Sequence, residues 1–295
     1  MAIEGGRWTG PIWDSHMHLD CEGRFIDAAL DFARTGGTHI CLVHKPEFGE
    51  NLPTNTEEIR HSYQNTLDIA ELVRRKCNID VRVILGPHPV VWEHQVRKFG
   101  FEQAGELHIA SVEIALAHCA EGEAVALGEV GRPHYSVDEE TWATANAQLV
   151  DVMHMASQEG VPIQLHVEDN GSQTNSELAT LCNRAGLTLN HAVHHYAQAD
   201  VSAKFTHGLS ASVSMGKGSV EKLLGTHSES ISTWTMETDY LDDPERPGAV
   251  LGPKTVPKRT QLLVEQLLQS NDVEFAEELL HNVHHVWPTE LYGEL

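Results

Sequence analysis

The stretch Asp14-Ser15-His16-Met17-His18 is the most informative starting point for predicting the fold. It follows a short apolar run, residues 10–13, which is typical of a buried parallel strand. Residues two apart in a strand point to the same side, so we expect His16 and His18 to face one point together. Two imidazoles placed in this way can hold one divalent cation, and Asp14 on the same side is expected to orient one ring.

Apolar runs and helical patterns alternate along most of the chain after this stretch. The predicted strands lie at residues 10–13, 38–43, 81–85, 124–128, 161–165, 191–195, 208–213 and 231–236. The predicted helices lie at residues 25–34, 57–76, 102–120, 139–159, 176–185, 258–269 and 273–286. This alternation implies right-handed crossovers and a parallel sheet. Eight units favour a closed α/β fold, a (β/α)8 TIM barrel that forms a single domain over residues 1–295.

Composition limits the possible classes of protein. The 295 residues are 41% hydrophobic, enough for a large core, and no apolar run is long enough to span a membrane. The amino terminus lacks the basic and apolar segments of a signal peptide, so we expect a cytoplasmic protein. Five scattered cysteines argue against a disulfide framework. The net charge of −23 repels polyanions at low salt.

Polar residues stand where several predicted strands end, which is the side on which such barrels carry their active sites. These candidate metal ligands are His16, His18, Glu129, His166, His194 or His195, and Asp239. Imidazoles and carboxylates in this ratio suit Zn²⁺, with Mn²⁺, Fe²⁺ or Mg²⁺ as alternatives. They are too many for one tetrahedral ion, whereas two metal ions bridged by a carboxylate would use them all.

Two further residues are candidates for binding the substrate. His88 lies in Gly86-Pro87-His88-Pro89, whose prolines make the segment rigid, and a histidine of a simple turn is the alternative. Arg132 is one of few cations expected near the mouth of the barrel, and a surface salt bridge is the alternative. Either side chain would bind an oxyanion of the substrate.

In these residues the chain resembles the TatD-type metal-dependent hydrolases of the amidohydrolase superfamily. The matching segments are residues 14–18, 86–89, 128–131, 165–166, 193–196 and 237–239. The resemblance implies a barrel with two metal ions. His16, His18 and Asp239 would hold one ion, His166 and the histidine of the sixth strand the other, and Glu129 would bridge them.

The chain departs from the family pattern in two places. Family members that cut nucleic acid typically have an arginine soon after the fifth-strand histidine, whereas His166 is followed by Val167-Glu168-Asp169-Asn170. The usual His-Cys-Phe after the sixth strand is replaced by His194-His195-Tyr196. The spacing to residues 207–208 is similar to the archaeal-type branch, which favours His195 over His194, with His191 as a third choice.

The predicted reaction is hydrolysis by metal-activated water, with Asp239 accepting the proton. The family resemblance favours phosphodiester bonds, as in a deoxyribonuclease or phosphodiesterase. A small-molecule amidohydrolase or lactonase is the alternative, supported by the acidic Glu168 and Asp169. A non-catalytic metal-binding protein is a third possibility, against which the presence of Asp239 argues. The substrate is thus a small molecule or a nucleic acid, and the sequence predicts no oligomeric state.

Overall fold

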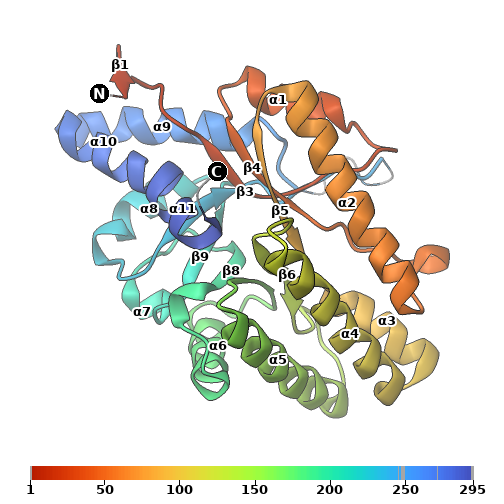
Figure 1. Cartoon of the computed structure of the whole chain (residues 1–295). Helices are drawn as coiled ribbons and strands as arrows, with labels where there is room; N and C mark the ends of the chain where they lie inside the picture. Colours follow the sequence, from red (N-terminus) through yellow and green to blue (C-terminus); the bar gives the residue numbers. More distant parts are fainter. Residues whose placement is uncertain (1, 245, 247–249, 271, 294–295) are drawn as a thin grey trace.

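The computed structural model describes residues 2–244, 246, 250–270 and 272–293. Its main sheet contains only parallel strands, in the order β10-β9-β8-β7-β6-β5-β4-β3-β11. These strands are β3 (Trp13–His18), β4 (His39–Val43), β5 (Asp80–Leu85), β6 (Ala126–Gly131), β7 (Ile163–His166), β8 (Ala192–Ala197), β9 (Ser210–Ser214), β10 (Trp234–Glu237) and β11 (Tyr240–Leu241). Figure 1 shows the strands at the centre and the helices around them.

The sheet closes into a barrel through its last strand, which is divided into two parts. β10 pairs with β9, whereas β11, which begins three residues later, pairs with the first barrel strand β3. The carboxylate of Asp14 in β3 accepts hydrogen bonds from the backbone nitrogen (3.0 Å) and the hydroxyl (2.7 Å) of Thr238, between β10 and β11. The predicted (β/α)8 barrel is confirmed, and the predicted role of Asp14 is wrong, because its carboxylate joins the first and last strands and does not orient a ring.

The helices that surround the sheet follow the predicted alternation, with additions. They are α1 (Ile26–Arg34), α2 (Thr56–Cys77), α3 (Pro89–Phe99), α4 (Phe101–Ala120), α5 (Glu139–Glu159), α6 (Ser172–Ala185), α7 (Ala203–Thr206), α8 (Ser219–Thr226), α9 (Thr255–Ser270), α10 (Val273–His281) and α11 (Trp287–Tyr292), with short 3-10 turns at Gly49–Asn51, Leu189–His191 and His227–Glu229 and a π-helical turn at Asn282–Val286. Helix α3 was not predicted. It begins at Pro89, which suits a first helical turn, and the side chain of His88 caps it.

The two faces of the sheet bury different clusters. Leu42, Val83 and Leu127 belong to the large apolar cluster shared with the outer helices. Cys41 and Ile84, which alternate with these residues, join a second cluster that includes Leu291 and Tyr292 of α11. The carboxyl-terminal helix therefore packs against the inside of the barrel.

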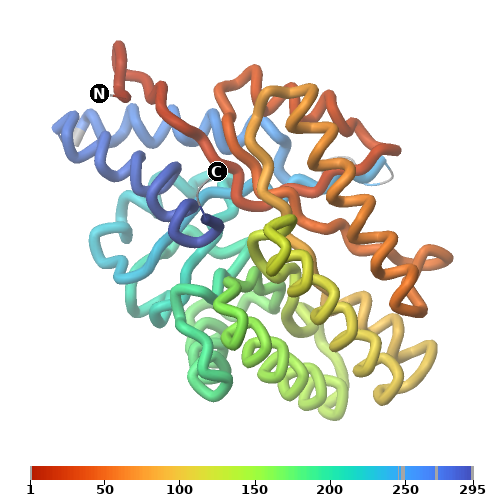
Figure 2. Tube along the Cα trace, viewed as in Figure 1, coloured from red at the N-terminus to blue at the C-terminus, as the bar shows by residue number. Residues whose placement is uncertain are grey.

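The amino-terminal segment lies beside two of the carboxyl-terminal helices. Strands β1 (Ile3–Glu4) and β2 (Arg7–Trp8) form a small antiparallel hairpin. The backbone nitrogen of Trp8 donates to Oε1 of Gln261 in α9 (3.1 Å). Figure 2 shows the amino-terminal segment beside the carboxyl-terminal helices α9 and α10. Among the described residues, no helix combines the length and apolar character needed to cross a membrane.

Candidate metal centre

His16 and His18 occupy alternate positions of β3, and their Nε2 atoms lie only 3.1 Å apart. Nδ1 of His16 lies 2.8 Å from Oε1 of Gln164, and Nδ1 of His18 lies 3.0 Å from the carbonyl oxygen of Val43. Both partners are acceptors, so both Nδ1 atoms carry the ring proton. The two Nε2 atoms therefore direct lone pairs toward the same point.

Gln164 fixes the orientation of His16. Its Nε2 donates to the carbonyl oxygen of Ser15 (2.9 Å) and lies 2.8 Å from the hydroxyl of Tyr292. Because the carbonyl oxygen of Ser15 can only accept, the amide group has one orientation, with Oε1 toward His16. Gln164 and His16 are fully buried, so this hydrogen bond is shielded from water.

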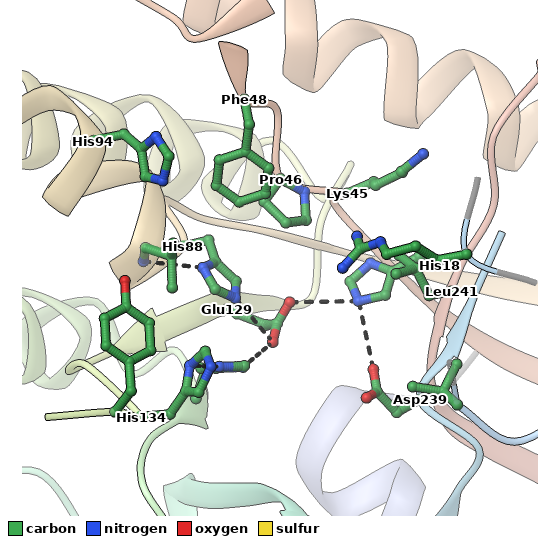
Figure 3. Close-up of a pocket in the computed structure, with 15 residues that line it drawn as sticks. His18, Lys45, Pro46, Phe48, His88, His94, Glu129, His134, Asp239 and Leu241 are labelled. Atoms are coloured by element: carbon green, nitrogen blue, oxygen red, sulfur yellow. Dashed lines mark hydrogen bonds and ion pairs between the residues drawn. The ribbon is translucent and has the colours of Figure 1, made fainter. Parts of the chain in front are cut away.

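The carboxylate of Glu129, in β6, lies between two sets of imidazoles. Its Oε2 is 3.4 Å from Nε2 of His18 and 3.8 Å from Nε2 of His16. Its Oε1 is 2.7 Å from Nδ1 of His166 and 3.0 Å from Nε2 of His195. The two oxygens therefore face different histidine pairs, which is the geometry of a bridging ligand. Figure 3 shows Glu129 between His18 and His88.

The second histidine pair comes from β7 and β8. Nδ1 of His166 lies 3.2 Å from Nε2 of His195, and Nε2 of His166 lies 2.8 Å from Nδ1 of His134. The other ring nitrogen of His195, Nδ1, is 3.2 Å from Oε1 of Glu237. Glu237 is fully buried and its Oε2 has no hydrogen-bond partner among the described residues. Glu237 thus orients the ring of His195 through Nδ1, the ring nitrogen that does not face Glu129.

Asp239 completes the cluster at the break between β10 and β11. Its backbone is in the left-handed region, with φ of 49°, and its Oδ1 lies 3.7 Å from Nε2 of His16 and 3.8 Å from Nε2 of His18. Burial raises the pKa of Asp239 well above its usual range, and the negative charge of Glu129 adds to this. A nearby cation would favour the ionised carboxylate instead.

The chemistry of these groups fits divalent cations. Burial holds the pKa of His16 well below its usual range and also lowers that of His18, so both rings are neutral and their lone pairs remain available. Ligand atoms of His16, His18 and Asp239 all lie within 4.8 Å of one another. Two converging lone pairs beside a carboxylate repel one another unless a positive charge lies between them.

The charge of Glu129 is favoured by its surroundings. Burial raises the pKa of its carboxyl, but the neighbouring imidazoles of His88, His195 and His166 outweigh burial and hold this pKa well below the usual range. For His195, burial lowers the pKa, whereas the carboxylates of Glu237 and Glu129 raise it well above the usual range. A proton at Nε2 of His195 thus occupies the position that a metal ion would take.

The structure distinguishes the three histidines considered for the sixth strand. His195 faces Glu129, whereas Nδ1 of the buried His194 lies 2.7 Å from Oδ1 of Asn175, on the other side of the strand. His191 lies in the 3-10 turn before β8, which spans Ala192–Ala197 and not the predicted residues 191–195. The register of β8 therefore brings His195 into the cluster.

His88 lies beside the cluster but presents a donor. Its Nδ1 accepts a hydrogen bond from the backbone nitrogen of Val90 (3.1 Å), so Nε2 carries the ring proton. This Nε2 lies 3.7 Å from Oε1 of Glu129, and the side chain lines the cavity. His88 is thus suited to donate to an oxygen in the cavity and not to coordinate a cation through Nε2.

Arg132 does not have the surroundings predicted for it. Its side chain is buried, and its nitrogens bind Oδ1 of Asn146 (2.8 Å), the carboxylate of Glu168 and Oε2 of Glu177 (2.9 Å). It also lies over the ring of Trp142, and it is not among the described residues that line the cavity. The predicted binding of a substrate oxyanion by Arg132 is therefore wrong, because these partners use four of its five N–H donors and the side chain is outside the described lining of the cavity.

A cavity of about 490 Å³ opens over the cluster. Its floor includes His18, Glu129, His166 and Asp239. Figure 3 shows Phe48, His94, His134, Lys45 and Leu241 around it. This volume suits a small molecule or one terminal unit of a larger one.

Several residues of the site were not predicted. Gln164 stands two positions before His166 in β7 and so shares a strand face with it, and Glu237 is the last residue of β10, two positions before Asp239. A polar residue inside an otherwise apolar strand was the available signal in both cases. Lys45, His134 and Phe48 lie in loops, where the sequence has no periodicity from which a side-chain direction follows.

A parallel barrel with histidines and carboxylates gathered at the carboxyl ends of its strands defines a class, the metal-dependent hydrolases of the amidohydrolase superfamily. Within that class the chain belongs to the TatD family, because the family described as TatD related DNase matches residues 13–288. The resemblance noted from the sequence is confirmed. Members of this family use divalent metal ions.

Three known proteins illustrate the similarity. The uncharacterized protein MJ1127 of Methanocaldococcus jannaschii is 28% identical over 262 residues, covering 87% of this chain and 88% of that protein. The crystal structure of YJJV, a TatD homologue from Escherichia coli K12, is 18% identical with a TM-score of 0.64, covering 96% of this chain and 98% of that one. A mutant of a phosphotriesterase-like lactonase from Deinococcus radiodurans is 12% identical with a TM-score of 0.59, covering 98% of both chains. The last two similarities concern the fold alone.

Proposed function

We propose that this protein is a binuclear metal-dependent hydrolase of phosphodiester bonds. His16, His18 and Asp239 would hold one ion, His166 and His195 would hold the other, and Glu129 would be the ligand shared between them. Zn²⁺ is the preferred metal, because the ligand set is rich in imidazole. Mn²⁺, Fe²⁺ and Mg²⁺ are the alternatives.

The main support for the proposal is that the two carboxylate oxygens of Glu129 face different pairs of histidines. Oε2 faces the lone pairs of His16 and His18, whereas Oε1 faces His166 and His195. A single cation would leave one of these histidine pairs without a positive partner. Two cations on either side of Glu129 satisfy both.

The chain's own residues have distinct tasks in the reaction. When bound, divalent cations supply a water molecule of lowered pKa and polarise the substrate oxygen. Asp239 accepts the proton of the attacking water at a carboxylate oxygen and passes it to the leaving oxygen. His88 donates from Nε2 to a substrate oxygen, since its Nδ1 is an acceptor. Glu237 and Gln164 keep the rings of His195 and His16 in one tautomer.

The second candidate is hydrolysis of a small lactone or amide. It is supported by the acidic surroundings of His166, where Glu168 pairs with Arg132 and leaves no cation for a phosphate on that side of the described cavity. The two candidates share the metal centre and differ in the electrophile. They are therefore distinguished by substrate and not by metal content.

The experiment is a metal analysis combined with a substrate panel. Purified protein should carry close to two divalent ions per chain, and His16→Ala should lose at least one. The holoenzyme is then assayed on aryl phosphodiesters, single-stranded DNA, lactones and amides. Full activity in chelator with no bound metal would overturn the metal-dependent mechanism, and metal binding without hydrolysis of any substrate would favour a non-catalytic binding protein.

A further inference from the structure

The cavity over the metal centre has two chemically different sides. On one side Phe48, His94 and Tyr135 form an aromatic wall, with the rings of Phe48 and His94 5.3 Å apart between centroids. The hydroxyl of Tyr135 donates to Oε2 of the buried Glu93 (2.8 Å), which fixes the ring in place. Figure 3 shows Phe48 and His94 on the side of His88 that faces away from Asp239.

The other side carries positive charge. Lys45, which follows β4, and Arg246, which follows β11, are the lysine and arginine among the described residues that line the cavity. Figure 3 places Lys45 on the same side as His18 and Leu241, across the cavity from His134. The cationic side therefore lies near His18 and Leu241, whereas Phe48 and His94 lie nearer His88.

The side chains of Lys45 and Arg246 each pair with a carboxylate but remain partly exposed. Nζ of Lys45 lies 2.6 Å from Oδ2 of Asp20, with 26% of its side chain exposed. Nε of Arg246 lies 2.8 Å from Oδ2 of Asp243, with 61% of its side chain exposed. An ion pair that faces water contributes little to stability, so either cation can share its charge with a bound anion. Nζ of Lys45 also lies 3.5 Å from the carbonyl oxygen of Asp242, so one of the three ammonium donors remains for a bound anion.

The size and charge of the protein favour a small ligand. The cavity volume of about 490 Å³ admits one aromatic group and one short anionic group around a reacting centre. A net charge of −23 opposes the approach of a long polyanion at low salt. The positive charges of Lys45 and Arg246 act over a short distance, so they favour an anion that lies within the cavity.

Building on the proposed function, we propose that Lys45 and Arg246 determine specificity for a small phosphodiester that carries a second anionic group. The aromatic or heterocyclic part of this substrate packs against Phe48, His94 and Tyr135. Its carboxylate or terminal phosphate binds Lys45 and Arg246. The scissile phosphorus lies between them, over Glu129 and Asp239.

The test compares two matched substrates, phenyl para-nitrophenyl phosphate and its carboxyphenyl counterpart, on the metal-loaded enzyme. The wild type should prefer the carboxylate-bearing ester by about tenfold in kcat/KM. Lys45→Met and Arg246→Met should each lose about tenfold on that ester, mainly through KM, and less than about twofold on the ester without the carboxylate. Lys254→Met is the control, because Lys254 pairs with Asp31 and does not line the cavity.

Equal losses on both esters, or none, would overturn this assignment. If the wild type cleaves neither ester, the proposed function fails, and the assignment is tested separately by calorimetric binding of carboxyphenyl phosphate. Binding that weakens by about tenfold in Lys45→Met and not in Lys254→Met supports the anion site without any catalysis. Equal affinity for all three proteins refutes it, and unchanged thermal unfolding of the variants shows that they are folded.

Discussion

The hydroxyl of Tyr292 lies 2.8 Å from Nε2 of Gln164, whose Oε1 lies 2.8 Å from Nδ1 of His16. A residue of the carboxyl-terminal helix is thus connected through one amide group to a candidate metal ligand of the first barrel strand. Each group in this chain of hydrogen bonds is buried. The orientation of His16 therefore depends on a residue more than two hundred positions away in the sequence.

The first prediction concerns this chain of hydrogen bonds. Gln164→Leu removes the acceptor of His16, so affinity for the metal at His16 and His18 should fall by about 10–100-fold, as for other residues that orient metal ligands. Tyr292→Phe keeps the amide and should have a smaller effect in the same direction. Competition with a chromophoric zinc chelator measures both. Tyr63→Phe, a buried tyrosine outside the site, should leave affinity unchanged; the same loss there would point to a general packing effect.

The second prediction concerns the sixth strand. His195→Ala should lower the metal content toward one ion per chain, because it removes an imidazole that faces Glu129. His194→Ala loses a hydrogen bond to Asn175 and should retain both ions. Metal analysis by atomic emission after gel filtration measures both variants. If His194→Ala loses an ion and His195→Ala does not, the assigned register of the strand is wrong by one residue.

The third prediction separates a metal ligand from a proton acceptor at Asp239. An amide cannot accept a proton, so Asp239→Asn at saturating metal should lose at least about 100-fold in kcat on a phosphodiester, the usual contribution of a positioned acid or base. KM should change little, since the substrate oxygen keeps its partners. Asp80→Asn, at the opposite end of the barrel strands, is the control. If added metal fully restores kcat, Asp239 acts only as a metal ligand and not as a proton acceptor.

The fourth prediction concerns His108, which is buried in α4 away from the metal centre, with no hydrogen-bond partner for its Nδ1 among the described residues. Burial lowers the pKa of His108 from 6.5 to about 3. Below about pH 6.5 His108 therefore binds a proton in the unfolded chain but not in the folded chain. The stability of the folded protein thus falls as the pH drops from about 6.5 toward about 3.

His108→Leu should remove this contribution. The slope of the unfolding free energy against pH should decrease by about 1.4 kcal/mol per pH unit well below pH 6.5, the value for one proton. Urea unfolding at several pH values measures the slope. His61→Gln, an exposed histidine of α2, should retain the wild-type profile. A slope identical in His108→Leu and wild type would show that His108 is protonated in the folded protein.

Much of the barrel and its cluster followed from the sequence because the relevant signals are local. Period-two alternation places His16 and His18 on one side of a strand, and short apolar runs deliver Glu129 and His166 to strand ends. Once eight such strands close into a barrel, their carboxyl ends must meet. The positions of these residues could therefore be predicted without any knowledge of long-range contacts.

The contacts of each polar side chain depend on the tertiary structure and could not be predicted. Asp14 bonds to Thr238, 224 positions away, and not to a neighbouring ring. Arg132 is bound by Glu168 and Glu177, so it is absent from the described lining of the cavity. Such contacts join elements that are adjacent in space but distant in sequence, and no periodicity encodes them. Local patterns thus predicted the candidate metal ligands at the strand ends, whereas packing set the contacts of the other polar side chains and brought the loop residues to the cavity.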